Sequence, residues 1–169
     1  TGRLPGGLAQ VNVLLSTVMG GLSGSNIADA AMESKMMVPE MTKKGFSLEF
    51  SSVVTAASSM ITPLIPPGIA MILYGCIANV SIGKLFISGL GVGGLLCVSM
   101  MILVGVVSKK RGYGILTTEK LTWSKFWTAL KPAILPLLLP IIIIGGIRIG
   151  VFTATEAGAV AILYAAFLG

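Results

Sequence analysis

The sequence has few side chains that could perform acid–base or metal chemistry. It contains no histidine, one aspartate (Asp29) and two cysteines, Cys76 and Cys97, without ligand-like spacing. These absences remove a serine–histidine pair, a histidine metal site and an aspartate dyad from this region. Both cysteines lie in apolar stretches, where cysteine typically acts as a small packing residue. The sequence therefore predicts no disulfide and no enzymatic activity.

Charge is also scarce, and the composition indicates an integral membrane protein. Charged residues make up 11% of the chain and hydrophobic residues 54%, whereas an ordinary soluble domain carries about 25% charged residues. The net charge of +6 comes largely from a basic cluster between two apolar segments. Such clusters mark cytoplasmic loops, and because they flank membrane spans this interpretation is favoured over nucleic-acid binding. The cluster consists of Lys109, Lys110, Arg111, Lys120, Lys125 and Lys131.

The ends of the chain predict an excerpt from a longer protein. The sequence begins at Thr1 without a methionine and stops at Gly169 inside an apolar run. Its first residues, TGRLPGG, show no basic region followed by an apolar core, so no signal peptide is visible.

Two apolar arms, 8–19 and 27–37, surround a tip rich in glycine and serine. Each arm has about 11 to 13 residues, or roughly 16–20 Å, which is too short for a hydrocarbon core of about 30 Å. The pattern predicts a re-entrant hairpin, and the alternative is one continuous helix with a glycine kink. The glycine pair 20–21 is expected to end the first arm, and Ser25 or Asn26 to cap the second.

The next apolar segment, 50–78, is long enough to cross a membrane but carries Pro63, Pro66 and Pro67 near its centre. Proline cannot donate to the carbonyl four residues earlier, so three carbonyls are predicted to lose their helical partners. In hydrocarbon such groups are tolerated only if they are buried in protein or line a wet cavity. The carbonyls concerned belong to Ser59, Thr62 and Pro63.

Hydroxyl groups accompany these carbonyls. Ser58, Ser59 and Thr62 precede the prolines, and hydroxyl and carbonyl oxygens together suit a hard cation. The helix that restarts after Pro67 offers free N–H groups from Gly68 onward, which favour an anion. The alternative is a proline kink whose polar groups are satisfied by neighbouring helices.

Apolar and basic stretches divide the chain into four predicted parts. Residues 1–49 form the hairpin and a cytoplasmic connection, and 50–107 the interrupted helix with the span that follows it. Residues 108–131 form a basic cytoplasmic loop with an interfacial helix that carries both tryptophans, and 132–169 form two further membrane segments. This arrangement also puts the lysines at 43–44 in the cytoplasm, so the hairpin enters and leaves from that side.

Six stretches resemble the large membrane subunit of tripartite ATP-independent periplasmic (TRAP) transporters. They are LPGGLAQVNVL, GGLSGSNIADAA, IPPGIAMILYG, VSIGKLFISG, VSKKRGYG and GGIRIGVFTATEAGAVAILYA, and they cover nearly the whole chain in the family's order. One departure is Ala154, where the family often has proline. The resemblance implies a central segment of that subunit, with an inverted repeat supplying a second hairpin and broken helix elsewhere.

The family imports organic acids such as dicarboxylates and sialic acid with a sodium gradient, a periplasmic substrate-binding protein and a small membrane subunit, separate or fused. The resemblance therefore implies an all-α polytopic transport protein in the cytoplasmic (inner) membrane of a bacterium or archaeon. It also implies sodium-coupled symport by an elevator-like movement. Sodium is expected between the hairpin tip and the broken helix, with the substrate carboxylate near the helix N-termini. The expected sodium ligands are Ser23, Gly24, Ser25, Asn26, Ser59, Thr62 and Pro63, and the expected substrate-binding residues are Ser58, Pro67 and Gly68.

Other charged residues fit structural roles better. Asp29 follows Asn26 by three residues, which favours helix capping over a direct role as a sodium ligand or proton carrier. Thr153 and Glu156 fit a capping box. Arg148 is expected to be an interfacial anchor or an ion-pair partner of Glu156, rather than a substrate contact.

Two other functions remain open. One is an ion-coupled organic-anion carrier or antiporter that needs no binding protein. The other is a membrane-embedded hydrolase, which would need a catalytic base that this region does not contain.

Overall fold

The regular elements that the structure describes are all helices, in agreement with the predicted all-α class. They are α1 (Gly7–Ser23), α2 (Asn26–Lys43), α3 (Leu48–Ser58), the 3-10 helix η1 (Ser59–Leu64), α4 (Ile69–Ala78), α5 (Ile82–Lys110) and α7 (Ala154–Leu168). The structure is a computed structural model that describes residues 6–113, 127, 131, 134–135, 138–139, 141–143, 145–147, 149–151 and 153–168.

Two stretches are long and apolar enough to cross a membrane. They are Leu48–Ala78, with 31 residues, and Ile82–Lys110, with 29 residues. The second stretch is the single long helix α5, whereas the first contains α3, η1 and α4 with irregular backbone between η1 and α4.

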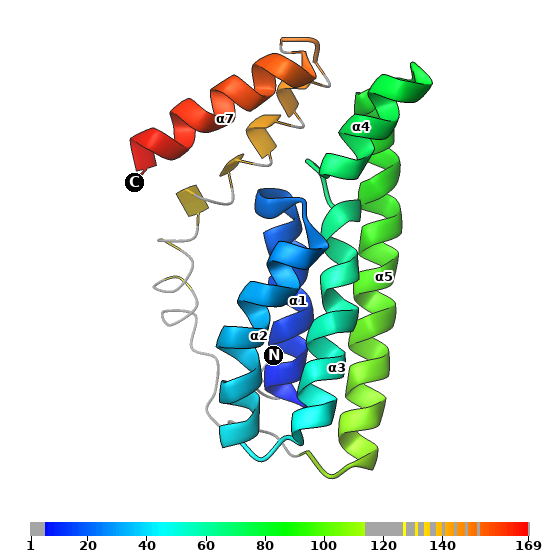
Figure 1. Cartoon of the computed structure of the whole chain (residues 1–169), viewed down its shortest axis with the longest axis vertical. Coiled ribbons are helices and arrows are strands. Elements are labelled where there is room, and N and C mark those ends of the chain that lie inside the picture. Colours follow the sequence, from blue (N-terminus) through cyan, green and yellow to red (C-terminus); the bar gives the residue numbers. More distant parts are fainter. Residues whose placement is uncertain are drawn as a thin grey trace.

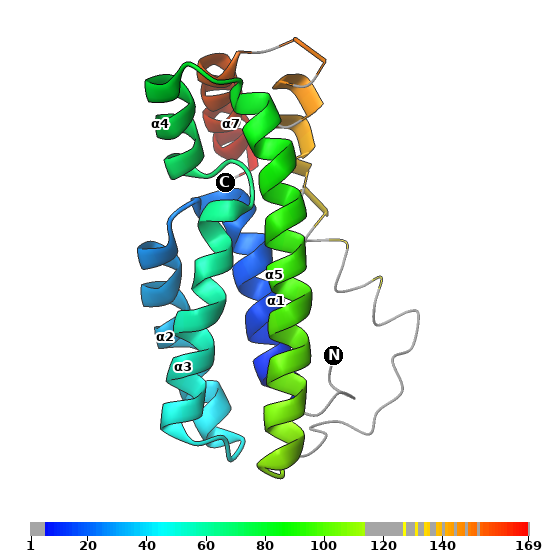
Figure 2. The same cartoon turned by 90° about the vertical axis from the view of Figure 1, so that its right-hand side faces the viewer.

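Helix α1 is the centre of the bundle. It contacts α2, α3, η1 and α5, and Figure 1 shows α2 running back alongside it. Figure 2 shows α5 extending along α1 and α3. The turn between α1 and α2 depends on Gly24, whose φ of 59° favours glycine. Ser25 then caps α2 by accepting a hydrogen bond from the Ala28 N–H at 3.5 Å, as the sequence predicts.

Both arms of this pair are longer than the sequence suggests. Helix α1 has 17 residues and continues through Gly20, and α2 has 18 residues and continues through Pro39. At 1.5 Å per residue each arm measures about 26–27 Å. The predicted ends of the arms, at the glycine pair 20–21 and at residue 37, are therefore wrong. Gly20 serves close packing: a Cβ there would lie 2.9 Å from the Thr62 carbonyl oxygen and 2.8 Å from the Ile65 Cβ.

An aromatic cluster joins the ends of three elements. The rings of Phe46 and Phe50 lie 4.7 and 5.2 Å from the ring of Tyr113, and the Arg111 guanidinium lies 5.7 Å from the Phe50 ring centre. The Ser47 N–H donates to the Tyr113 hydroxyl at 3.1 Å, which lowers the pKa of that phenol. We call this end of the bundle the basic end, because it also carries Lys43, Lys44, Lys109 and Lys110.

The start of α7 confirms the predicted capping box. The Thr153 N–H donates to Glu156 Oε2 at 2.8 Å, and the Glu156 N–H donates to Thr153 Oγ1 at 3.3 Å. Arg148 lies outside the described residues, as does Trp123 of the predicted interfacial helix.

Candidate functional site

The helix of the first long stretch changes character at Ser58. It becomes the 3-10 helix η1, which contains Pro63, and the chain is then extended at Ile65 before α4 begins. The Ile65 N–H donates to the Thr62 carbonyl at 3.2 Å. The prediction of a free Thr62 carbonyl is therefore wrong, because the tighter 3-10 turn supplies a donor three residues later where Pro66 removes the α-helical one.

The tip of the α1–α2 pair lies directly against this interruption. A Cβ on Gly24 would lie 2.5 Å from the Pro67 carbonyl oxygen and 3.3 Å from the Gly68 Cα, and a Cβ on Gly68 would lie 2.3 Å from the Pro63 carbonyl oxygen. Only glycine at 24 and 68 permits these approaches. Two carbonyl oxygens thus face glycines where the tip meets the start of α4.

No side chain caps the start of α4. Its N-cap residue is Gly68, which has no side chain that could accept a hydrogen bond from the first N–H groups. The backbone N of Ile69 lies 3.2 Å from the position that a Gly24 Cβ would occupy. The first N–H groups of a helix have no intrahelical partner and favour an anion.

The other predicted tip residues lie less deeply. Ser23 and Ser25 are half-buried, and Asn26 is exposed. Within the tip, the Ser25 N–H donates to Ser23 Oγ at 3.5 Å. Ser59 is buried, and its hydroxyl donates to the Ala56 carbonyl at 2.9 Å. Of the predicted site residues, the structure therefore brings Gly24, Pro63, Pro67 and Gly68 together most closely.

A buried polar seam extends from this contact between α1 and α3. Asn12 Nδ2 donates to Thr55 Oγ1 at 2.7 Å, and one turn further along both helices Ser16 Oγ lies 2.9 Å from Ser58 Oγ. All four side chains are at most 2% exposed. Ser58, a predicted substrate residue, thus contacts α1 here and does not line the tip.

Two carboxylates of α2 complete this seam. Asp29 and Glu33, one turn apart, are 1% and 0% exposed. The Thr62 hydroxyl donates to Asp29 Oδ2, and the Ser16 hydroxyl donates to Glu33 Oε2 at 2.6 Å. The other oxygen of each carboxylate has no hydrogen-bond partner among the described residues. Asp29 therefore does not cap α2, since Ser25 does so and the Asp29 side chain turns to Thr62.

The sequence interpretation missed Asn12, Ser16 and Glu33. The signals were present: Asn12 and Ser16 stand four apart in an apolar helix, and Glu33 stands four after Asp29. Residues four apart lie on one helix face, so each pair marks a polar stripe in an otherwise apolar segment.

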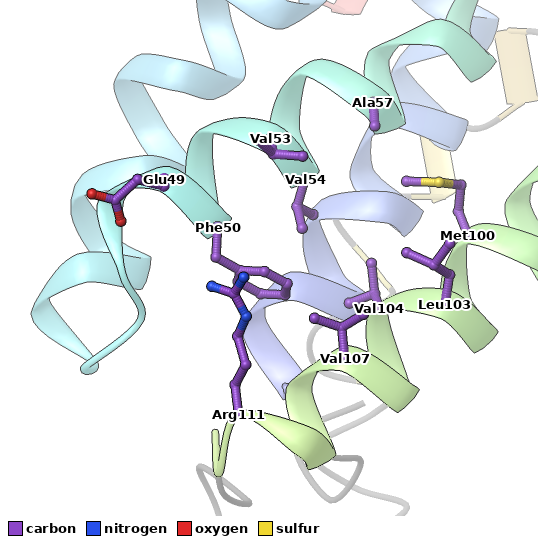
Figure 3. A pocket seen from close by; sticks show the side chains of 10 residues that line it. All are labelled: Glu49, Phe50, Val53, Val54, Ala57, Met100, Leu103, Val104, Val107 and Arg111. Atoms are coloured by element: carbon purple, nitrogen blue, oxygen red, sulfur yellow. The ribbon is translucent and has the colours of Figure 1, made fainter.

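A separate, apolar cavity of about 360 Å³ lies between α3 and α5. Figure 3 shows its walls, with Arg111 beside Phe50 and Glu49 at the start of α3. Nonpolar side chains line the rest of it, so it does not suit an organic acid or a hard cation. The nonpolar lining consists of Phe50, Val53, Val54, Ala57, Met100, Leu103, Val104 and Val107.

Comparison with known proteins gives consistent matches. The family described as "Tripartite ATP-independent periplasmic transporter, DctM component" matches residues 1–169. The sialic acid TRAP transporter large permease protein SiaM of Vibrio cholerae is 42% identical over 168 residues, and the ectoine TRAP transporter large permease protein TeaC of Halomonas elongata is 41% identical over 167 residues. The 2,3-diketo-L-gulonate TRAP transporter large permease protein YiaN of Escherichia coli is 37% identical over 167 residues. Each alignment covers 99% of this chain and 39% of the relative, so the chain spans about two fifths of the length of these proteins.

Proposed function

Because the chain belongs to the DctM-component family of tripartite ATP-independent periplasmic transporters, we propose that it is part of a sodium-coupled permease subunit that imports an organic acid. The complete subunit works with a periplasmic binding protein and a small membrane subunit, separate or fused, in the inner membrane. The names of the relatives, which are large permease proteins of TRAP transporters, support this proposal.

In this proposal α1 and α2 form a re-entrant hairpin, and α3, η1 and α4 form one discontinuous membrane helix. The contact of Gly24 with Pro67 supports this pairing, because it places the tip at the interruption. Irregular backbone at membrane depth is tolerated where it is buried in protein or lines a cavity. The first condition is met where the buried tip glycine covers the residues before α4.

The sodium ion is proposed to bind between the tip and the interruption. The candidate ligands are oxygen atoms of backbone and hydroxyl groups, which suit a hard cation. The carbonyls of Pro63 and Pro67 lie closest to the contact, since each crowds a glycine there. The crowding of Gly24 by the Pro67 carbonyl is the observation that carries the proposal. The predicted ligand set also includes Ser59 and the tip residues Ser23, Gly24, Ser25 and Asn26.

Thr62 has a different role in this arrangement. Its hydroxyl donates to Asp29 Oδ2, and its carbonyl accepts from the Ile65 N–H. Asp29 therefore acts as a positioning residue that ties the first turn of α2 to η1. The proposed site forms only when the α1–α2 hairpin packs against α3 and η1. We call this the docked hairpin, and the hydrogen bond of Asp29 to Thr62 stabilises it.

The substrate carboxylate is proposed to approach the N-terminus of α4. Its N–H groups follow Gly68, where no side-chain hydrogen bond caps the helix, and such a terminus favours anions through its free donors and its dipole. The anion and the sodium ion then lie on neighbouring parts of one interruption, and each stabilises the other electrostatically. This proximity provides a physical basis for coupling their transport.

Uptake measurements test the proposed function. The full-length permease, its small subunit and its binding protein are reconstituted in proteoliposomes, and substrate uptake is followed with and without an inward sodium gradient. Uptake is expected only when both the gradient and the binding protein are present. Uptake that persists without the gradient contradicts sodium coupling. Uptake that persists without the binding protein points instead to a carrier that acts alone.

A further inference from the structure

Glu33 is a buried ionisable side chain that the proposed sodium and substrate sites do not use. It lies about two turns into α2 and is 0% exposed. Its Oε2 lies 2.6 Å from the Ser16 Oγ. Its second oxygen, Oε1, has no partner in the described part of the chain. A carboxylate ion in this position would leave a charged oxygen without a hydrogen bond, which is far more costly than leaving a neutral carbonyl oxygen so.

No cation from the elements packed against α2 compensates a charge on Glu33. These elements are α1, α3 and η1. The described sequences of α1 and η1 contain no charged residue, and the charged residue of α3, Glu49, is exposed near the basic end. On α2 itself, Asp29 lies one turn away and adds a like charge. The remaining charged residues of α2, which are Lys35, Glu40 and Lys43, are exposed.

The hydroxyl groups around Glu33 are arranged so that a neutral acid satisfies all of them. The single Ser16 proton has acceptors at Glu33 Oε2 (2.6 Å), Ser58 Oγ (2.9 Å) and the Asn12 carbonyl (3.3 Å). Ser58 Oγ in turn lies 3.1 Å from the Thr55 carbonyl. A protonated Glu33 donates to Ser16, Ser16 donates to Ser58, and Ser58 donates to the Thr55 carbonyl.

In the ionised state these hydroxyl groups serve one carboxylate oxygen, Oε2, and leave Oε1 without a partner among the described residues. Hydroxyl protons rotate to suit their acceptors, so Ser16 can turn its proton to Glu33 while Ser58 keeps the Thr55 carbonyl. The hydrogen bond between Glu33 and Ser16 can therefore change direction without any movement of heavy atoms. The seam therefore favours the neutral acid, and the carboxylate finds partners for both of its oxygens only when water reaches it.

We infer that Glu33 is a proton-binding residue of this permease. In the docked hairpin it is a neutral carboxylic acid whose O–H donates to Ser16. Exposure of the seam to water, when α1 and α2 separate from α3, lets the proton pass from Glu33 to water and leaves a hydrated carboxylate. Docking of the hairpin then takes up one proton from water. Hairpin docking is therefore sensitive to pH, separately from any dependence on sodium.

Infrared spectroscopy of the full-length permease in its complex tests this inference directly. The wild-type protein is expected to show the carbonyl stretch of a buried protonated carboxyl group, and Glu33→Gln is expected to lose it. Glu40→Gln is the matched control, because it removes an exposed carboxylate from the same helix and should leave the band unchanged. Glu33→Asp, which keeps an acid, should retain the band at a shifted frequency and serves if the glutamine variant does not fold. A band that is absent from the wild type, or that persists unchanged in both Glu33 variants, overturns the inference.

The functional consequence rests on the proposed transport activity and is read separately. Uptake by the reconstituted wild-type complex is expected to vary with pH, and Glu33→Gln should flatten that pH profile while it keeps the dependence on sodium. An unchanged pH profile in Glu33→Gln overturns the coupling of this proton to transport. Loss of sodium dependence in the wild type would instead contradict the proposed function and leave the infrared result standing.

Discussion

At the scale of single residues, the buried polar groups connect the hairpin to the rest of the bundle. On α2, Asp29 is hydrogen-bonded to Thr62 of η1, and Glu33 is hydrogen-bonded to Ser16 of α1. A hydrogen bond to a charged group contributes about 1.5–3 kcal/mol, more than an ordinary one. In an apolar bundle these few contacts decide how α2 is positioned against its neighbours.

The Thr62→Val substitution tests the link between η1 and Asp29. It keeps the shape of the side chain but removes the hydroxyl, so it should lower the free energy of unfolding by about 2–3 kcal/mol. Thermal unfolding of the purified full-length permease measures this effect. Thr17→Val is the control, because among the described residues the Thr17 hydroxyl bonds only the Val13 carbonyl of its own helix. Equal stability losses in the two variants would contradict the role assigned to Thr62.

The residues of this seam could be predicted only in part from the sequence. Ser25 is recognisable as a cap because the signal is local. The environment of Asp29 and Glu33 is not local, since it depends on which face of α2 meets α1. The α2 sequence places Ile27, Met32 and Met36 among its polar residues, so apolar side chains occur all round the helix. No single apolar stripe then identifies the buried face.

At the scale of elements, glycine residues let α1 and its C-terminal turn pack closely against the interrupted helix. Gly20 and Gly24 each bring the α1 backbone against residues of the interrupted helix. The sequence interpretation took the glycine pair 20–21 as a helix end, because glycine is a common terminator. Tertiary packing is what overrides this local preference. The interruption after Ser58 was recognisable because proline removes a backbone donor wherever it stands.

The Gly20→Ala substitution measures how closely α1 packs against η1. Alanine favours helix by up to about 1 kcal/mol, but its Cβ would lie 2.9 Å from the Thr62 carbonyl oxygen. Overpacking of this kind costs about 1–3 kcal/mol, so the variant should unfold at a lower temperature. Gly94→Ala in α5 is the control, because a Cβ there meets nothing within 4 Å. Equal or higher stability of Gly20→Ala would show that this contact is looser than described.

At the scale of the whole molecule, one end of the described bundle is both basic and aromatic. At the basic end, the start of α3 and the end of α5 lie together around the aromatic cluster of Tyr113. The turn between α4 and α5, near Asn79, lies at the other end of α5 (Figure 1). Of the predicted cytoplasmic residues, Lys43, Lys44, Lys109, Lys110 and Arg111 therefore lie at one end of the bundle, as expected if they share one side of the membrane.

Cysteine accessibility tests this orientation. In a variant that lacks Cys76 and Cys97, a cysteine that replaces Lys44 should react with a membrane-impermeant reagent only from the cytoplasm. A cysteine that replaces Asn79 should react only from the periplasm. Lys109→Cys is the internal control, because it lies at the same end as Lys44 and should behave like it. Reaction of the cysteines at 44 and 79 from the same side would contradict the arrangement.

The central claim is that the hairpin tip and the interrupted helix together hold sodium, and Gly24→Ala tests it most directly. Alanine would be strained at the left-handed φ of 59° and would meet the Pro67 carbonyl. Left-handed backbone alone costs about 1–2 kcal/mol, which corresponds to about tenfold in affinity. The sodium concentration that gives half-maximal uptake should therefore rise at least about tenfold, while Gly91→Ala, where a Cβ meets nothing within 4 Å, should leave it unchanged. A Gly24→Ala permease with wild-type sodium dependence would contradict the account.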